Sequence, residues 1–173
     1  MAVLPLVVAP DPRLKLCSET VTEVDATIQQ LVDDMFDTMY ASGGIGLAAV
    51  QVGVHKRILV MDIEQDEQRK PGHPLVLINP EIITSSPEIN VYEEGCLSFP
   101  GQYAEVKRPK YVTVRYLDYD GVPQEIKADG LLATCVQHEI DHLNGVTFVD
   151  HVSPVKRDMI IRKIKKAQRA HKT

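Results

Sequence analysis

The stretch DGLLATCVQHEIDHLNG, residues 129–145, decides the fold of this chain, because it predicts a helix that carries both apolar and reactive side chains. Leu132, Val136 and Ile140 recur every four residues, which is the spacing of one helical face. The helix is expected to start near the first residue of this stretch and to end at its closing Asn-Gly pair, a common helix terminus. The apolar face predicts that the helix is buried in the core.

This helix contains the pattern H-E-x-x-H at residues 138–142. Residues four apart lie about 6 Å apart along one helix face. His138 and His142 can therefore hold one divalent ion, with Glu139 beside it as a proton carrier. A chance match of three fixed residues is expected in roughly one chain of this size in a few hundred. The helical context favours a metal site over two histidines that face solvent.

A catalytic metal needs a third protein ligand and an open position for water. No glutamate follows Glu139, which excludes families with a downstream Glu ligand. Gly145 matches the glycine of the metzincin pattern, but Phe148 stands where that pattern has its third histidine. Asp150 and His151 stay open as ligands outside any known spacing.

Two cysteines are further candidates for the third ligand. Cys135 lies about 10.5 Å along the helix from His142, too far for a short thiol to share its ion. A packed core cysteine is therefore the favoured interpretation of Cys135. Cys96 lies in the segment EGCLS, residues 94–98, where a turn could present a thiolate. Spacing alone leaves Cys96 only slightly favoured over a structural cysteine.

The glycine-rich segment SGGIGLAAVQ, residues 42–51, admits three interpretations. It resembles a phosphate loop weakly, because it follows a helix and has no Lys-Ser/Thr pair. It fits a helix C-cap followed by a tight turn. It also fits bare backbone that lines a cleft where another chain lies close. In that case Gln51 could donate an amide proton to a developing oxyanion.

The remaining pattern predicts an α+β fold with a mainly antiparallel sheet, because the order is helix, strands, helix, helix. The first helix is expected over about Asp25–Ala41, capped by Asp25 and ended by Ser42-Gly43-Gly44. Strands are expected at Ile58–Ile63, Leu75–Asn79, Tyr111–Leu117 and Gln124–Ala128, the last two joined by a turn at residues 118–121. A third helix should start at Ser153-Pro154, with the apolar residues Val155, Met159, Ile160 and Ile164 on one face.

Composition predicts one domain over residues 1–173. No apolar run approaches the roughly 18–20 residues of a membrane helix, and we expect no membrane span and no signal peptide. The odd number of three cysteines argues against a disulfide framework and favours a reducing compartment, so we expect no disulfide partner. The net charge of −5 argues against general nucleic-acid affinity. Residues 151–173, however, hold eight of the 19 Lys and Arg and a single acidic residue, so a basic C-terminal helix is predicted.

Three segments together, GIGLAAVQ at residues 44–51, EGCLS at 94–98 and QHEIDH at 137–142, resemble the three signature motifs of peptide deformylases. The resemblance extends over nearly the whole chain and includes APDPRL at residues 9–14. It is closest to the bacterial, type 1 form with its long C-terminal helix. The fold that it implies has mainly antiparallel sheets packed around the H-E-x-x-H helix.

The resemblance implies a metallohydrolase that removes the formyl group from N-formylmethionine on newly made polypeptides. It implies Cys96, His138 and His142 as ligands of Fe²⁺, with Zn²⁺, Ni²⁺ or Co²⁺ able to take the site. It implies Glu139 as the general base and acid, and the Gln51 amide and the Leu97 backbone N–H as donors to the oxyanion. It further implies a cytoplasmic, bacterial protein, while a processed organellar form stays open. It associates the basic helix with docking on the ribosome, and an amphipathic helix that only closes the core is the equal alternative.

The resemblance also implies a substrate site and a brace for the metal turn. The residues expected to contact the peptide are Gly44, Ile45, Gly46, Tyr92, Gly95 and Leu131, together with the edge of His138. Glu94 and Arg108 match a family ion pair, although an exposed pair of this kind would stabilise little. Tyr103 stands where some relatives have an arginine, and Thr134 and Tyr92 replace aliphatic residues. These departures put a charged contact to the substrate and the size of the pocket in question.

Two other functions fit the H-E-x-x-H motif. The first is a zinc metallopeptidase of the H-E-x-x-H type, which would need a third ligand other than Cys96. The second is a domain that stores or senses the ion without catalysis. Glu139 discriminates between an enzyme and a storage protein, because only an enzyme needs its carboxylate for turnover.

Overall fold

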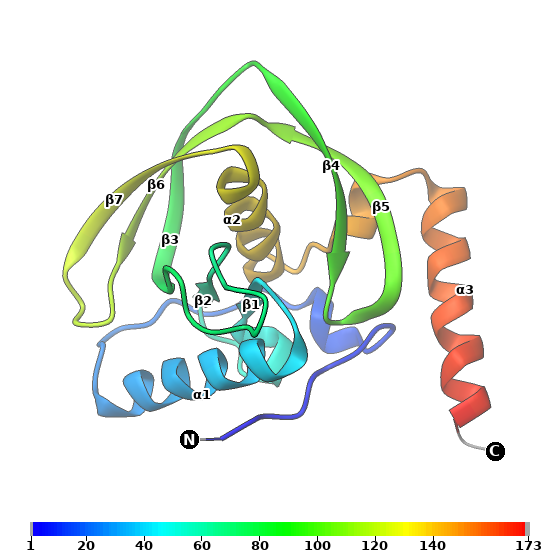
Figure 1. Ribbon diagram of the computed structural model, residues 1–173, viewed down its shortest axis with the longest axis horizontal. Helices are drawn as coiled ribbons and strands as arrows, with labels where there is room; N and C mark the ends of the chain where they lie inside the picture. The colour runs from blue at the N-terminus through cyan, green and yellow to red at the C-terminus, as the bar shows by residue number, and fades with distance from the viewer. Residues whose placement is uncertain (1, 172–173) are drawn as a thin grey trace.

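The computed structural model describes residues 2–171, in which α2 lies beneath an arch of strands, α1 lies below the sheet and α3 lies at the side, next to β5 (Figure 1). The elements are η1 (Pro12–Lys15), α1 (Ala26–Ser42), β1 (Gly46–Ala48), η2 (Ala49–Val52), β2 (Ile58–Met61), β3 (Leu75–Ser85), β4 (Ile89–Cys96), β5 (Phe99–Pro109), β6 (Tyr111–Leu117), β7 (Pro123–Asp129), α2 (Gly130–Leu143), η3 (Phe148–His151) and α3 (Pro154–His171). The predicted α+β class, with antiparallel sheets around the H-E-x-x-H helix, is confirmed.

The first helix has the ends that its sequence indicates. Asp25 is the N-cap, and its carboxylate accepts a hydrogen bond from the backbone N–H of Ile28 at 3.0 Å. Gly43 closes the helix in the left-handed conformation, with φ of 79°, which glycine adopts without a steric penalty. The chain passes from α1 to β1 through residues 43–45. The interpretation of this segment as a helix C-cap is confirmed.

The main sheet has five antiparallel strands in the order β1-β2-β3-β6-β7. Strand β2 is buried on both faces, which explains its unbroken apolar sequence. Leu59 and Met61 pack with the apolar residues of α2, whereas Ile58 and Val60 pack with those of α1. The sheet thus separates two cores, and β1 is left at its edge.

The strand predictions were correct in kind but not in every boundary. The strand predicted over Ile58–Ile63 ends at Met61, and the one predicted over Leu75–Asn79 continues to Ser85. Strands β6 and β7 pair as a hairpin around the predicted turn at residues 118–121. The hairpin of β4 and β5 was missed as a pair, because its charged and proline residues hide an alternation that buries only one face.

Helix α3 closes a third core against β5 and η3. Ile160 and Ile164 are buried there, but Val155 and Met159 are 72% and 48% exposed. The predicted apolar face is therefore wrong for its first turns, because the body of the protein contacts only one side of the helix. None of the helices in residues 2–171 combines the length and the apolar composition that a membrane span requires.

Candidate metal centre

Helix α2 carries three reactive side chains into the interior. His138, Glu139 and His142 are 7%, 3% and 0% exposed. The rings of His138 and His142 lie one turn apart with centroids separated by 5.1 Å. The two imidazoles therefore face the same space, as the spacing of the motif predicts.

A third donor reaches this space from the small sheet. Cys96 ends β4, where the ladder with β5 shifts register and pairs Cys96 with Phe99 across a tight turn. The Cys96 sulfur lies 3.3 Å from Nε2 of His142. One donor atom from each of Cys96, His138 and His142 falls within 4.8 Å of the other two. Sequence spacing left open whether Cys96 is a ligand or a structural cysteine. The turn after β4 places its thiol beside the two histidines of α2.

These three residues fit a divalent metal ion. Ligands held at about 2.0–2.3 Å around one tetrahedral ion lie roughly 3.5 Å apart. The separation of 3.3 Å between the Cys96 sulfur and Nε2 of His142 is close to this value, and all three donors lie within 4.8 Å of one another. His138 offers the correct nitrogen, because its Nδ1 lies 2.9 Å from a Glu94 oxygen and a carboxylate only accepts hydrogen bonds. The proton therefore lies on Nδ1, and Nε2 is free to coordinate. A sulfur and two imidazole nitrogens are a donor set that transition metals prefer.

The other candidate ligands lie elsewhere. The Cys135 sulfur contacts the backbone oxygen of Ile45 at 3.8 Å, and burial raises the pKa of this thiol well above its ordinary value. His151 instead contacts a carboxylate oxygen of Asp141 at 2.8 Å, and Asp150 accepts a hydrogen bond from the backbone N–H of Thr147. All three cysteines are free thiols.

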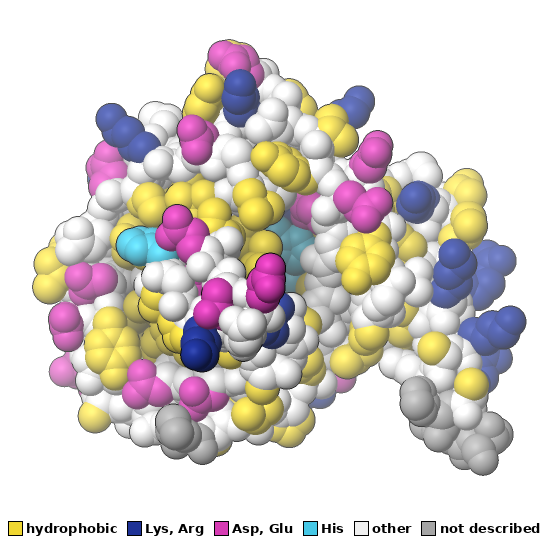
Figure 2. All heavy atoms as spheres, viewed as in Figure 1, with side chains coloured by type: hydrophobic (Ala, Val, Ile, Leu, Met, Phe, Trp, Pro, Cys, Tyr) yellow, Lys and Arg dark blue, Asp and Glu magenta, His cyan; other side chains and the backbone are white. Residues whose placement is uncertain are grey.

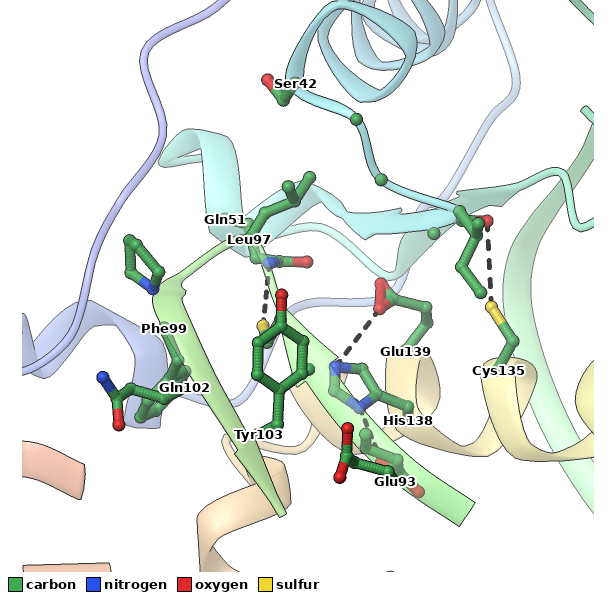
Figure 3. Close-up of a pocket in the computed structure, with 18 of the residues that line it drawn as sticks. Ser42, Gln51, Glu93, Leu97, Phe99, Gln102, Tyr103, Cys135, His138 and Glu139 are labelled. Carbon is green, nitrogen blue, oxygen red and sulfur yellow. Dashed lines mark hydrogen bonds and ion pairs between the residues drawn. The ribbon is translucent and has the colours of Figure 1, made fainter. Parts of the chain in front are cut away.

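Glu139 has the environment of a group that exchanges protons near neutral pH. Its carboxylate lies 3.6 Å from Nε2 of His138 (Figure 3), and its Oε2 has no hydrogen-bond partner within residues 2–171. Burial raises the pKa of Glu139 to about 7, against the opposing attraction of His138. A carboxyl group with such a pKa both takes up and returns a proton at neutral pH.

The orientation of the Gln51 side chain is set by a hydrogen bond from the backbone of Ala48. Its Oε1 accepts the N–H of Ala48 at 2.9 Å, so its Nε2 must point away from that strand. The Nε2 donates to Ser98 Oγ at 3.1 Å and to the Cys96 sulfur at 3.4 Å. In Figure 3 a dashed line from the Gln51 amide to a sulfur atom marks this second contact. This preset amide donor is buried beside the cluster, and Leu97, in the turn that follows Cys96, lines the same cavity.

The turn between β4 and β5 that carries Cys96 is held by a network of ion pairs among Glu94, Arg108 and Asp141. Arg108 donates to both oxygens of Glu94, at 2.7 and 3.0 Å, and to Asp141 at 2.8 Å. Arg108 and Glu94 are only 4% and 6% exposed, so this is not the surface pair that a cautious interpretation of the sequence expects. Burial alone would raise the pKa of Glu94, but its hydrogen bonds from His138 and Arg108 hold it below the ordinary value. The ionised carboxylate therefore orients His138.

A cavity of about 560 Å³ opens beside these groups, between α2, β1 and the β4–β5 hairpin. Every predicted substrate residue lines it, namely Gly44, Ile45, Gly46, Tyr92, Gly95, Leu131 and His138. Gly95 is required by packing, because a Cβ there would lie 2.6 Å from the Tyr103 ring. Ile45 and Leu131 are 40% and 41% exposed, which leaves apolar side chains facing the cavity.

Some residues of the site escaped the sequence analysis. Ser98, which bonds Gln51, and Asp141, which bonds Arg108, were given no role. Cys135 was taken as a core residue, yet it also lines the cavity. Its position four residues after Leu131, on the same helix face, is the signal that could have revealed it.

Comparison with known proteins agrees with this geometry. Residues 3–158 match the family model described as polypeptide deformylase. A peptide deformylase of Agrobacterium fabrum is 55% identical over 170 residues, which cover 98% of this chain and 99% of the relative. The crystal structure of the peptide deformylase from Ehrlichia chaffeensis superposes with a TM-score of 0.94 at 50% identity, covering 99% of this chain and 100% of the other. A second structure from that organism, in complex with actinonin, has a TM-score of 0.92 at 53% identity, covering 98% and 99%.

The family match covers nearly all of the chain and contains every residue of the cluster built by α2 and the β4–β5 turn. Relatives of this identity and coverage share the fold. The chain therefore belongs to the polypeptide deformylase family, whose members are metal-binding hydrolases.

Proposed function

We propose that this protein removes the formyl group from N-formylmethionine at the start of newly made polypeptides. The observation that carries the proposal is the meeting of Cys96, His138 and His142 with a buried carboxylate and a preset amide at one end of an apolar cavity. The free edge of β1 borders the same cavity, which suits a substrate with an extended peptide backbone.

Cys96, His138 and His142 would hold the divalent ion. Such an ion supplies a Lewis acid that lowers the pKa of a water that it binds. Glu139 takes the proton of the attacking water and returns it to the departing amine, for which its pKa of about 7 is suited. Gln51 and the backbone N–H of Leu97 donate to the formyl oxygen as negative charge develops there. One such donor typically lowers a barrier by about 3 kcal/mol.

The cavity accounts for the choice of substrate. The methionine side chain enters the apolar space between Ile45, Tyr92 and Leu131. The peptide backbone adds to the edge at residues 44–46, with the Gly95 backbone on its other side. A formyl carbon carries only hydrogen where an acetyl carbon carries a methyl group, so a tight site rejects acetylated peptides by overlap.

We propose Fe²⁺ as the ion used in the cell. A thiolate with two imidazoles also accepts Zn²⁺, Ni²⁺ or Co²⁺, so purified protein can carry any of these. Anaerobic metal analysis of freshly prepared protein identifies the bound ion. The deformylation rate of the same preparation shows which ion supports activity. Activity that follows zinc content and not iron content would overturn the choice of iron.

We further propose that residues 1–173 act as one catalytic domain in the cytoplasm and that α3 docks on the ribosome. Dark-blue basic side chains gather on α3 in Figure 2. Met159 is 48% exposed among Arg162, Lys163 and Lys166. Cations in this arrangement suit a phosphate backbone. The variants Lys163→Gln and Lys166→Gln together should reduce ribosome co-sedimentation at low salt, and unchanged co-sedimentation would overturn the docking.

The central test compares two substrates. We expect formate release from formyl-Met-Ala-Ser and no cleavage of a blocked casein-like peptide. Cleavage of internal amides without formate release would identify a metallopeptidase instead. Glu139→Ala should retain the ion and lose turnover, and full activity in this variant would contradict its role as base and acid.

A further inference from the structure

Within residues 2–171, no strand pairs with the edge of β1 that borders the cavity. Strand β1 pairs with β2 on one side only, with Gly46 opposite Met61. The N–H of Asp62 donates to the oxygen of Ile45 at 2.8 Å, so this carbonyl faces β2. Because pairing alternates along an antiparallel strand, the polar groups of Gly46, opposite Met61, point away from β2. Gly46 also lines the cavity. A peptide can pair with this edge only where its backbone is held in position.

The loop of residues 62–74, between β2 and β3, is organised by one buried carboxylate. Asp62 is 1% exposed, and it accepts hydrogen bonds from the Tyr40 hydroxyl at 2.7 Å and the Glu64 backbone N–H at 3.0 Å. It also accepts the backbone N–H groups of Gly72 and His73, at 2.9 and 3.0 Å. Four donors from α1 and from both ends of the loop thus converge on one side chain, which gives the loop a defined shape.

Two side chains of this loop hold the residue before β1. Gln65 Nε2 donates to the backbone oxygen of Gly44 at 2.9 Å and to the oxygen of Asp62 at the same distance. Arg69 Nη2 donates to the same oxygen of Gly44 at 2.7 Å, a short bond from a charged donor. The carbonyl that precedes the exposed edge is therefore held from outside the cavity by two donors.

The position of Arg69 requires a strained backbone and leaves one of its nitrogens without a hydrogen bond within residues 2–171. Its φ of 62° lies in the left-handed region, which a side chain other than glycine rarely occupies. Its Nε is buried without a hydrogen-bond partner within residues 2–171. Strain of this kind persists where the surrounding structure enforces it, and it is concentrated at functional sites. In this conformation the Arg69 backbone N–H donates to the oxygen of Asp66 at 2.9 Å, while its side chain makes the bond to Gly44.

We propose that Arg69, assisted by Gln65, is a positioning residue that holds the edge at residues 44–46 in the geometry needed to pair with the substrate peptide. The inference rests on the proposed function and adds a determinant of peptide binding that lies outside the metal centre. Arg69 acts through the Gly44 carbonyl and touches no reacting atom. Its loss should therefore weaken binding of substrates that have a peptide backbone beyond methionine, and not the chemical step.

The test compares formyl-Met-Ala-Ser with free N-formylmethionine, which has no downstream backbone to pair. Arg69→Ala should lower kcat/KM for the tripeptide about 10-fold, mainly through KM, as expected for loss of a charged hydrogen bond. It should change kcat/KM for N-formylmethionine less than about twofold. Arg69→Lys, which retains one charged donor, should recover part of the loss. Gln68→Ala, an exposed position in the same loop, is the matched control and should leave both substrates unchanged.

The outcomes separate this proposal from the proposed function. Equal losses for both substrates, or no loss for either, would overturn the positioning role. Absence of formate release by the unmodified protein would overturn the proposed function itself. If Arg69→Ala does not fold, as judged by circular dichroism, Gln65→Ala removes the second donor to the same carbonyl and must show the same dependence on peptide length.

Discussion

Replacement of Arg108 by methionine tests the brace of the metal turn most directly. Arg108 is 4% exposed and makes three charged hydrogen bonds of 2.7–3.0 Å with Glu94 and Asp141. Methionine fills much of the volume but leaves the buried Glu94 carboxylate without its cation. Removal of one partner from a buried ion pair costs about 3–5 kcal/mol. This is a large share of the roughly 5–15 kcal/mol by which a domain is stable.

Urea unfolding of the metal-loaded protein measures this loss as a lower free energy of unfolding. Thermal unfolding measures it as a lower Tm. Each kcal/mol lowers Tm by about 2–4 °C in a chain of this size, so we expect Tm to fall by roughly 6–20 °C. Metal affinity should fall about 10- to 100-fold as well, because Glu94 then orients His138 less firmly. Arg13→Met, which removes an exposed ion pair with Asp11, is the control and should have little effect.

A double variant shows whether the cost arises from the unpaired charge. Glu94→Gln removes the charge while keeping an oxygen that accepts a hydrogen bond. The combination of Arg108→Met with Glu94→Gln should cost less than the sum of the two single changes. A loss below about 1 kcal/mol for Arg108→Met alone would refute the reasoning, because the pair would then be worth no more than one on the surface.

The remaining predictions concern the metal centre. Cys96→Ser should weaken or exchange the bound metal, as measured by competition with a chelator, and unchanged affinity would count against a thiolate ligand. Gly46→Ala should lower kcat at least 10-fold in a formate-release assay, since its Cβ would lie 3.0 Å from both the Cys135 sulfur and Glu139 Cγ. Glu139→Gln should stabilise the metal-free protein by an amount that grows from about pH 4.5 to about pH 7, because the folded state keeps a proton there that the unfolded state has released. The gain should approach roughly 3 kcal/mol in urea titrations at each pH, and a gain that shrinks as pH rises would contradict the raised pKa of Glu139.

Local patterns predicted the helices and most strands because they depend on contacts between near neighbours. The cap at Asp25, the terminus at Gly43 and the pairing of β6 with β7 all follow from residues close in sequence. The β4–β5 hairpin was not predicted from local patterns, because its buried face packs against elements that are distant in sequence. The exposed start of α3 shows the same limit, because apolar spacing indicates a face but not whether anything covers it.

The sequence by itself determined that two imidazoles and a carboxylate share one face of a buried helix, because the period of an α-helix places them there. Spacing left the third ligand open between Cys96, Asp150 and His151, and the resemblance to the deformylase motifs pointed to Cys96. Tertiary structure alone places the Cys96 sulfur 3.3 Å from His142, 46 residues away in sequence, and Arg69 on the oxygen of Gly44. The physical reason is that helical period is a local property, whereas these contacts depend on how two sheets and a loop pack around the helix.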